Sequence, residues 1–263
     1  MENSGVAQLF PAGTRLIRLF AEPGLPPLPG WDDAGMELCK SRSRGRAVRG
    51  NGVFLKEYVY TSPWDKFRQR FKTPRPFVSL EAARRLEELG VPTPPVAAAV
   101  RGVSPDGCVH DLLVTKELAP GVVFGDKLAA ELGDKRISLA RELVPLAFRM
   151  HEGGLIHGDL SLRNWYRTPE GVWGLIDLDG AKVLRGAASK SRRTDELARL
   201  ASSCFTAATQ VSDGIAELRR FIRNFFDEYA RCGGAVDLGR FARRSRFLAD
   251  RFRTRYLDMD VLK

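Results

Sequence analysis

The chain has 263 residues, of which 44% are hydrophobic, so it can bury a substantial core in one large domain or in two lobes. Its formal charge of +10 indicates attraction to an anionic partner: nucleic acid, an acidic membrane face or a phosphorylated substrate. The four cysteines lie far apart with no CxxC pair, which argues against a zinc site or a disulfide framework. We expect reduced thiols in a cytosolic protein.

The first 35 residues give no sign of a membrane-crossing or secretory segment. Arg15 and Arg18 interrupt the apolar part and no small-residue cleavage site follows it, so we expect no secretory signal. No uncharged apolar run in the chain approaches the roughly 18 residues that span a bilayer, so any membrane contact is expected to be peripheral. The proline-rich stretch from Pro23 to Pro29 predicts that residues 1–35 form an extended lead-in with little rigid structure.

Residues 36–118 read as a β-rich lobe. The segments 36–40, 53–60, 96–100 and 110–118 predict strands, and the basic segment 41–52 predicts a turn. A helix is predicted over 78–89, because leucine and alanine recur at i, i+3 spacing until Gly90. Lys56 lies inside a predicted strand. A buried lysine needs an anionic partner, whereas an edge lysine does not.

The segment 62–77, SPWDKFRQRFKTPRPF, alternates aromatic and basic residues. One interpretation is a surface element that docks on phosphate headgroups or on a glycolipid. The other is a solvated excursion whose Trp64, Phe67 and Phe71 fold back on the core.

After Pro120 the pattern changes from strands to helices, which predicts a lobe boundary near 117–120 and a helical lobe over 119–263. Helices are predicted at 124–132, 138–152, 194–208 and 218–229. The last segment, 238–257, predicts a basic amphipathic helix. It reads either as a cap on this lobe or as a surface for an anionic partner.

The chemistry concentrates in the segment His157 to Gly180. Asp159 follows a short apolar run on a loop, where a carboxylate can accept a proton from an attacking hydroxyl. Asn164 comes five positions later, and Asp177 follows the apolar run 172–176. Their side-chain oxygens suit Mg²⁺, a hard cation. The segment therefore predicts a phosphoryl-transfer site.

These features together resemble the protein-kinase-like fold, an α+β bilobal architecture with a β-rich N-lobe and a helical C-lobe. The residues HGDLSLRN match the catalytic-loop pattern HxDxxxxN, and IDLDG takes the place of the D-F-G segment. By this resemblance Asp159 is the catalytic residue, and Asn164 and Asp177 are the metal ligands. Lys56 holds the α- and β-phosphates of ATP with Glu81 as its helix partner.

Within that superfamily the chain is similar to the lipopolysaccharide kinase family, which phosphorylates heptose or Kdo sugars of the inner core. The similarity runs from about Cys39 to the C-terminus and includes LEAARRLEELGVPTPPV, LLVTKELAPG and SRRTDELARL. It implies ATP and Mg²⁺ as cofactors. It assigns Glu117, Leu118 and Ala119 to the nucleotide-binding hinge, and gives Asp195 a supporting role in holding the backbone of the catalytic loop.

Several positions depart from the kinase pattern. The segment 41–52 has no GxGxxG spacing, so we expect Arg44, Arg46 and Arg49 to substitute for glycine amides as phosphate contacts. Asp179 stands where D-F-G has glycine, and is either a further metal ligand or a partner of a nearby cation. Arg163 is either an orienting group for the acceptor or γ-phosphate, or an exposed loop arginine.

The leading hypothesis is an ATP- and Mg²⁺-dependent kinase acting on a lipopolysaccharide core glycolipid. We expect it to be cytoplasmic and peripheral on the anionic inner face of the cytoplasmic membrane, with no nucleic-acid partner. The alternatives are an atypical, RIO-like protein Ser/Thr kinase, a small-molecule phosphotransferase on the same fold, and a pseudokinase scaffold. The scaffold is disfavoured because the chain retains all four residues that kinases use for catalysis: Lys56, Asp159, Asn164 and Asp177.

Overall fold

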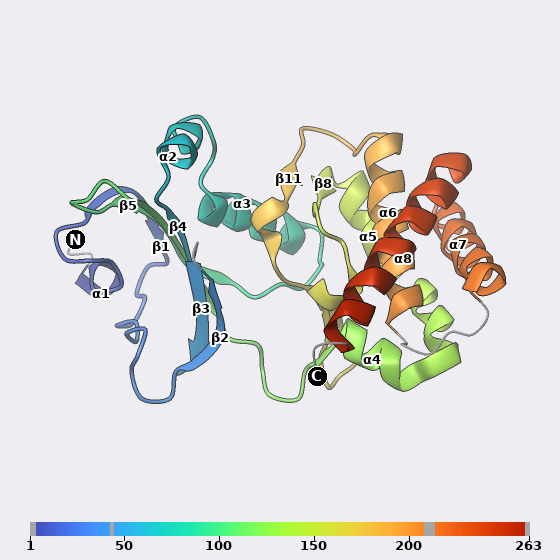
Figure 1. The fold of residues 1–263 in the computed structure, drawn as a ribbon, viewed down its shortest axis with the longest axis horizontal. Coiled ribbons are helices and arrows are strands. Elements are labelled where there is room, and N and C mark those ends of the chain that lie inside the picture. Colours follow the sequence, from blue (N-terminus) through green and yellow to red (C-terminus); the bar gives the residue numbers. More distant parts are fainter. Residues whose placement is uncertain (1–3, 43–44, 208–213, 261–263) are drawn as a thin grey trace. The chain divides into compact units, whose positions relative to one another are not determined.

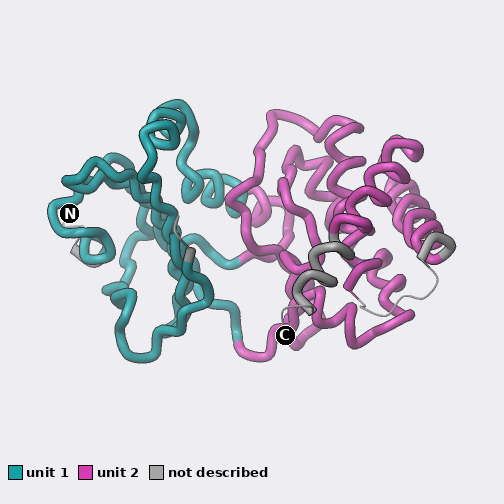
Figure 2. Tube along the Cα trace, viewed as in Figure 1, with its two compact units in different colours: residues 1–83, 94–119 teal, residues 84–93, 120–263 magenta. Residues whose placement is uncertain are grey.

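The structure is a computed structural model that describes residues 4–42, 45–207 and 214–260. The chain divides into two compact units, the first made of residues 1–83 and 94–119 and the second of residues 84–93 and 120–263 (Figure 2). The first unit is built on a sheet and the second mostly on helices (Figure 1). The α+β class with a β-rich first part and a helical second part is therefore confirmed.

A six-stranded antiparallel sheet forms the centre of the first unit. Its strand order is β1-β5-β6-β4-β3-β2. The strands are β1 (Arg15–Ala21), β2 (Glu37–Arg42), β3 (Gly45–Gly50), β4 (Val53–Tyr60), β5 (Val96–Val103) and β6 (Val109–Lys116). Helices α2 (Pro63–Gln69) and α3 (Arg75–Glu88) connect β4 to β5, and α3 continues into the second unit.

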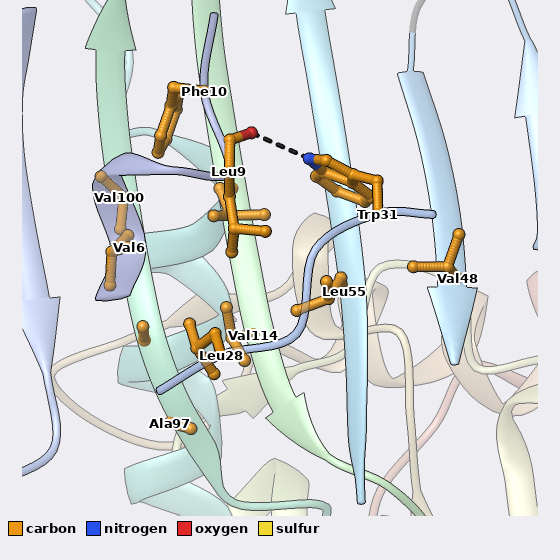
Figure 3. Packing of buried hydrophobic residues seen from close by; sticks show 12 residues of the cluster. Val6, Leu9, Phe10, Leu28, Trp31, Val48, Leu55, Ala97, Val100 and Val114 are labelled. Carbon is orange, nitrogen blue, oxygen red and sulfur yellow. Dashed lines mark hydrogen bonds between the residues drawn. The ribbon is translucent and has the colours of Figure 1, made fainter. Parts of the chain in front are cut away.

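The N-terminal segment is ordered against this sheet, so the expected loose lead-in is wrong. It begins with α1 (Ser4–Ala7) and supplies the edge strand β1, which pairs with β5. Leu28 and Trp31 are buried, and the indole N–H of Trp31 donates to the carbonyl of Leu9 at 2.8 Å (Figure 3). The prolines shape this segment, but the apolar residues between them bury enough surface to fix it on the sheet.

Side chains of the N-terminal segment cover one face of the sheet. They pack with Val48, Leu55 and Val114, which stand opposite one another on β3, β4 and β6 (Figure 3). Successive residues of a strand point to opposite faces, so Lys56 lies on the other face, in register with Ala47 and Leu113.

The basic segment after β2 is also more regular than expected, because most of it forms β3. Arg46 lies on the covered face, where it donates to the Glu57 carboxylate at 3.1 Å and stacks on the Trp31 ring at 4.0 Å. Arg49 forms an ion pair of 2.7 Å with Glu37. Both arginines therefore have protein partners. Arg46 lies on the face opposite to Lys56, so its expected phosphate contact is wrong, whereas that of Arg49 stays a prediction. The third, Arg44, is outside the described residues.

The second unit contains five helices and two small sheets within the described residues. The helices are α4 (Gly125–Leu132), α5 (Leu139–Glu152), α6 (Lys190–Thr206), α7 (Gly214–Arg231) and α8 (Leu238–Asp260). Strands β7 (Val123–Phe124), β9 (Trp165–Arg167) and β10 (Trp173–Leu175) form one sheet, and β8 (Leu155–Ile156) pairs with β11 (Lys182–Val183). Short 3₁₀ turns occupy Gly133–Ser138, Leu162–Asn164 and Leu178–Gly180.

The C-terminal helix α8 packs on α6 through its apolar side. Phe241 and Leu248 are buried, while Arg243 and Arg246 are exposed. The side chains from residue 252 onward lie outside the described part. Within the described part, the apolar side of α8 belongs to the core of this unit, as expected of a cap. None of the described helices is long and apolar enough to cross a membrane.

Candidate active site

The loop that carries Asp159 begins directly after the two-stranded sheet of β8 and β11, in which Ile156 pairs with Lys182. Gly158 has φ of 87°, a left-handed conformation that favours glycine, and a Cβ there would lie 2.3 Å from the carbonyl oxygen of Gly180. No side chain fits in that space. Glycine at position 158 is thus required by the close approach of the Gly180 segment.

Glu196 on α6 holds the backbone of this loop. Its carboxylate accepts hydrogen bonds from the N–H groups of His157 at 2.9 Å and Gly158 at 2.5 Å, and a third from the His151 ring at 3.3 Å. Burial acts to raise the pKa of the Glu196 carboxyl, but the hydrogen bonds that it accepts, chiefly the one from the His151 ring, outweigh burial, so the pKa is lowered. A buried, ionised acceptor therefore fixes the loop.

The sequence-based assignment of this role to Asp195 is wrong. Asp195 instead forms a bidentate ion pair with Arg240 of α8, at 2.9 and 2.6 Å. Neighbouring residues on a helix point about 100° apart, so only one of the two acids can face the loop. The sequence does carry a signal for this choice. Glu196 is followed directly by the buried Leu197 and belongs to the apolar side of α6, whereas Asp195 does not.

The two proposed metal ligands flank one hairpin, with Asn164 directly before β9 and Asp177 two residues after β10. Strands β9 and β10 pair with Leu175 opposite Trp165, and the N–H of Ile176 donates to the carbonyl of Asn164 at 2.9 Å. This pairing brings Asn164 next to the residue that precedes Asp177. The buried Asn164 amide nitrogen donates to the backbone carbonyl of Asp159 at 2.8 Å, which leaves the amide oxygen as its metal-binding atom.

Asp177 has a left-handed backbone, with φ of 62° and ψ of 54°. Only a few per cent of non-glycine residues adopt this conformation, and such residues concentrate at functional sites. The carboxylate of Asp177 is exposed and follows the end of β10. The backbone conformation thus directs an exposed carboxylate out of the hairpin that carries Asn164.

His157 connects the two halves of the site. Its Nε2 lies 2.9 Å from the carbonyl oxygen of Ile176, and its Nδ1 lies 3.3 Å from the backbone N–H of Asp159. A carbonyl can only accept and an N–H can only donate, so we assign the neutral ring with its proton on Nε2. The ring therefore ties the Asp159 loop to the strand end before Asp177.

Asp159 itself lies between two arginines. Arg163 donates to one carboxylate oxygen at 2.7 Å and Arg199 to the other at 2.8 Å. Burial acts to raise the pKa of Asp159, but the Arg163 hydrogen bond and the charges of both arginines outweigh it, so the pKa is lowered. Arg163 is thus more than an exposed loop arginine. Arg199 was missed, because it is distant in sequence and no motif marks it.

The residues assigned to the nucleotide lie in the first unit. Lys56 on β4 is half-buried, with its Nζ 5.2 Å from the centre of the Tyr58 ring. Glu81 lies on α3 with an exposed side chain, so its pairing with Lys56 remains a prediction. Glu117, Leu118 and Ala119 follow β6, and the N–H of Glu117 already donates to the carbonyl of Gly52 at 2.9 Å.

The donor set of the second unit fits Mg²⁺. Among the described residues, no group of three or more His, Cys, Asp and Glu side chains could form a complete metal cage. Mg²⁺ does not require one, because it is usually held by one or two protein oxygens together with water and substrate phosphates. Asn164 and Asp177 supply that number of oxygen ligands.

Comparison with known proteins identifies the family of the chain. The sequence model of the lipopolysaccharide kinase (Kdo/WaaP) family matches residues 50–225. The chain belongs to the lipopolysaccharide kinase (Kdo/WaaP) family. It is therefore a kinase, a phosphotransferase. The matched range contains Lys56, the Asp159 loop, the hairpin of β9 and β10 and the part of α6 that carries Glu196 and Arg199.

Solved structures are similar to this lipopolysaccharide kinase at the level of the fold. WaaP in complex with acyl carrier protein aligns with a TM-score of 0.58 and 22% identity, over 91% of this chain and 98% of that one. WbdD, described as a bifunctional kinase-methyltransferase, aligns with a TM-score of 0.44 and 16% identity, over 72% of this chain and 42% of that one. A structure of monomeric WbdD aligns with a TM-score of 0.44 and 17% identity, over 72% of this chain and 44% of that one. No curated protein sequence matches the chain significantly.

Proposed function

We propose that this lipopolysaccharide kinase transfers the γ-phosphoryl group of ATP to a sugar hydroxyl, of heptose or Kdo, in the lipopolysaccharide inner core. Family membership supports the class of acceptor. The observation that carries the catalytic part is the fixed relation of three groups: the Asp159 carboxylate, the Asn164 amide bonded to the backbone of Asp159, and Asp177 at the end of the same hairpin.

In the proposed reaction the acceptor O–H proton passes to Asp159 as a new bond forms between the acceptor oxygen and the γ-phosphorus. The bond from that phosphorus to the β,γ-bridging oxygen breaks, and ADP leaves. Asn164 and Asp177 would hold Mg²⁺, which when bound offsets negative charge on the phosphates. Positioning and electrostatic stabilisation, more than covalent chemistry, are what the protein supplies in phosphoryl transfer.

Residues of the first unit would bind the nucleotide. Lys56 would contact the α- and β-phosphates, with Glu81 as its partner, and the backbone from Glu117 to Ala119 would contact the base. The N–H of Glu117 is already bonded to Gly52. We therefore assign the base contacts to the carbonyl of Glu117 and to the backbone of Leu118 and Ala119.

We propose that the enzyme works in the cytoplasm, peripherally bound to the inner face of the cytoplasmic membrane. ATP and a membrane-anchored core glycolipid are both accessible there. The formal charge of +10 supports attraction to an anionic surface, and such attraction weakens as salt rises.

The test is transfer of label from γ-labelled ATP to dephosphorylated lipopolysaccharide core, with a generic protein and an aminoglycoside as competing acceptors. We expect label on the core sugar with wild type and loss of at least about a hundredfold in rate with Asp159→Ala. Asp134→Ala is the matched control, because that carboxylate is fully exposed. Label only on the protein or only on the aminoglycoside would refute the acceptor, and unchanged ATP turnover in Asp159→Ala would refute the mechanism.

A further inference from the structure

Helix α2 and the residues after it expose three large aromatic side chains. Trp64 is 66% exposed, Phe67 50% and Phe71 76%. The interpretation in which these rings fold back on the core is therefore wrong. Leaving three adjacent aromatic rings in water is costly, since each buries a large apolar area when covered.

The three rings form one continuous ridge. Trp64 and Phe67 lie one turn apart on α2, and Phe71 follows in the turn after the helix. The Trp64 and Phe67 rings are stacked with centroids 6.0 Å apart, and Phe71 meets Phe67 edge to face at 5.2 Å. We call Trp64, Phe67 and Phe71 the aromatic ridge.

The ridge is held by buried contacts at the end of its helix. Arg101 donates to the Gln69 backbone carbonyl at 2.9 Å and to its side-chain oxygen at 3.3 Å. The same arginine forms a bidentate pair with the fully buried Asp111, at 2.6 and 2.7 Å. The helix start is fixed as well, since the Ser62 hydroxyl accepts from the N–H of Asp65 at 3.1 Å. The helix that exposes these rings is thus anchored to strands β5 and β6 through Arg101 and Asp111.

Basic side chains flank the ridge. Lys66, Arg68, Arg70 and Lys72 alternate with it in sequence. Asp65 is the one acid among them in the segment, and Asp106 of the neighbouring turn interacts with Lys66. A surface with an apolar centre and a cationic border is complementary to a partner that is apolar inside and anionic at its face. An acidic lipid bilayer has this composition, and tryptophan and arginine are favoured at its interface.

We propose that the aromatic ridge inserts into the interface of an anionic membrane, while Lys66, Arg68, Arg70 and Lys72 contact lipid phosphates. This inference rests on the proposed function in one respect: a glycolipid acceptor is presented by a membrane. Single-stranded nucleic acid also binds aromatic and basic surfaces, but it needs open ring faces on which bases stack. Here the Trp64 and Phe67 rings stack on each other, so one face of each ring is not open to a base. This arrangement favours insertion of the whole aromatic ridge into a membrane.

Trp64 provides a direct signal for the test. Of the four tryptophans, the other three, Trp31, Trp165 and Trp173, are buried. We expect a blue shift of the fluorescence and protection from iodide quenching when vesicles of phosphatidylglycerol and phosphatidylcholine are added, and no change with phosphatidylcholine alone. Trp64→Phe keeps an aromatic ring and should abolish the fluorescence change while vesicle co-sedimentation persists.

Substitution of the ridge tests its contribution to binding. Trp64→Ala/Phe67→Ala/Phe71→Ala should weaken co-sedimentation with the anionic vesicles about tenfold or more. The matched control is Phe247→Ala, which removes an exposed phenylalanine of α8. Lys66→Gln/Arg68→Gln/Arg70→Gln/Lys72→Gln should also weaken binding, whereas Arg219→Gln/Arg220→Gln/Arg243→Gln/Arg246→Gln removes the same charge from exposed positions elsewhere and should weaken it much less.

The outcomes separate this inference from the proposed function. Vesicle binding is measured without any acceptor, so a protein inactive on core sugars can still confirm the ridge. If the protein is active, the triple alanine variant should lose much more activity on glycolipid in vesicles than on water-soluble core oligosaccharide. Undiminished vesicle binding by that variant would overturn the proposal. So would a shift of that variant from dimer to monomer in size-exclusion chromatography, or binding of single-stranded RNA in preference to vesicles.

Discussion

Arg199 donates a 2.8 Å hydrogen bond to Oδ1 of Asp159, so the proposed proton acceptor is paired with a cation from helix α6 before any acceptor sugar is present. Together with Arg163 this cation lowers the pKa of the carboxyl. The two arginines keep the Asp159 carboxylate ionised and fixed in orientation, and they also make it a weaker base. Such a group suits a reaction in which orienting the hydroxyl contributes more than removing its proton early.

Removing Arg199 should move the pH profile in a definite direction. The arginine stabilises the ionised carboxylate, so Arg199→Gln should raise the pKa of Asp159, and kcat/KM should be lost at a higher pH on the acid side than in wild type. Arg199→Lys should restore part of the shift. The control is Arg223→Gln, which removes a surface arginine paired with Asp227. An unchanged acid limb in Arg199→Gln would contradict the pairing.

Glu196 should act as a positioning residue for the catalytic loop. Glu196→Gln replaces one carboxylate oxygen by a donor that faces a backbone N–H, and should cost about 1–3 kcal/mol of unfolding free energy. It should lower kcat more than it raises KM for ATP. Asp195→Asn, by contrast, removes a half-exposed ion pair and should change stability by about 1 kcal/mol or less, with kcat retained. Chemical denaturation and steady-state kinetics measure both. Equal effects of the two substitutions would argue against the role of Glu196.

Gly158→Ala should be poorly tolerated. The added methyl group would meet the Gly180 carbonyl at 2.3 Å in a backbone region that alanine avoids. We expect a loss of about 2 kcal/mol or more of stability and a marked loss of activity. Gly186→Ala is the control, because a Cβ there meets nothing within 4 Å. Thermal unfolding of the two variants side by side decides the prediction, and a wild-type melting temperature for Gly158→Ala would reject it.

The N-terminal segment should contribute strongly to the first unit. Leu28→Ala removes a buried side chain and should destabilise the protein by about 2–5 kcal/mol. Trp31→Phe removes the hydrogen bond to the Leu9 carbonyl and some packing, with a smaller loss. Leu38→Ala, at an exposed position, should cost about 0.5 kcal/mol or less. If Leu28→Ala and Leu38→Ala unfold at the same denaturant concentration, the segment does not stabilise the sheet.

Local patterns predicted the elements that carry short-range signals. Strand β4 follows from its β-branched and aromatic residues, and helix α3 from its i, i+3 apolar spacing up to Gly90. The Asp159 loop follows from one contiguous motif. The positions of the N-terminal segment and of β3 did not follow, because proline and arginine content suggested irregular backbone. Their order comes from burial of Leu28 and Trp31 against strands much later in the chain, which no local window contains.

Long-range pairing explains the misses at the site. Asp195 and Glu196 are both acids on the same predicted helix, and only the rotation of α6 in the folded unit decides which one meets the loop. Arg199 becomes a neighbour of Asp159 through the same rotation. A contiguous motif predicts candidates for the chemistry, whereas the groups that hold those candidates in place depend on tertiary packing.

The hairpin hydrogen bond between Ile176 and Asn164 has an evolutionary consequence. Asp159, Asn164 and Asp177, with the Glu196 and His157 bonds that fix them, all belong to the second unit. Helix α2 belongs to the other unit and makes none of these contacts, so mutations that change the aromatic ridge leave them in place. The proposed base and metal ligands can thus be inherited unchanged while the proposed membrane contact diverges.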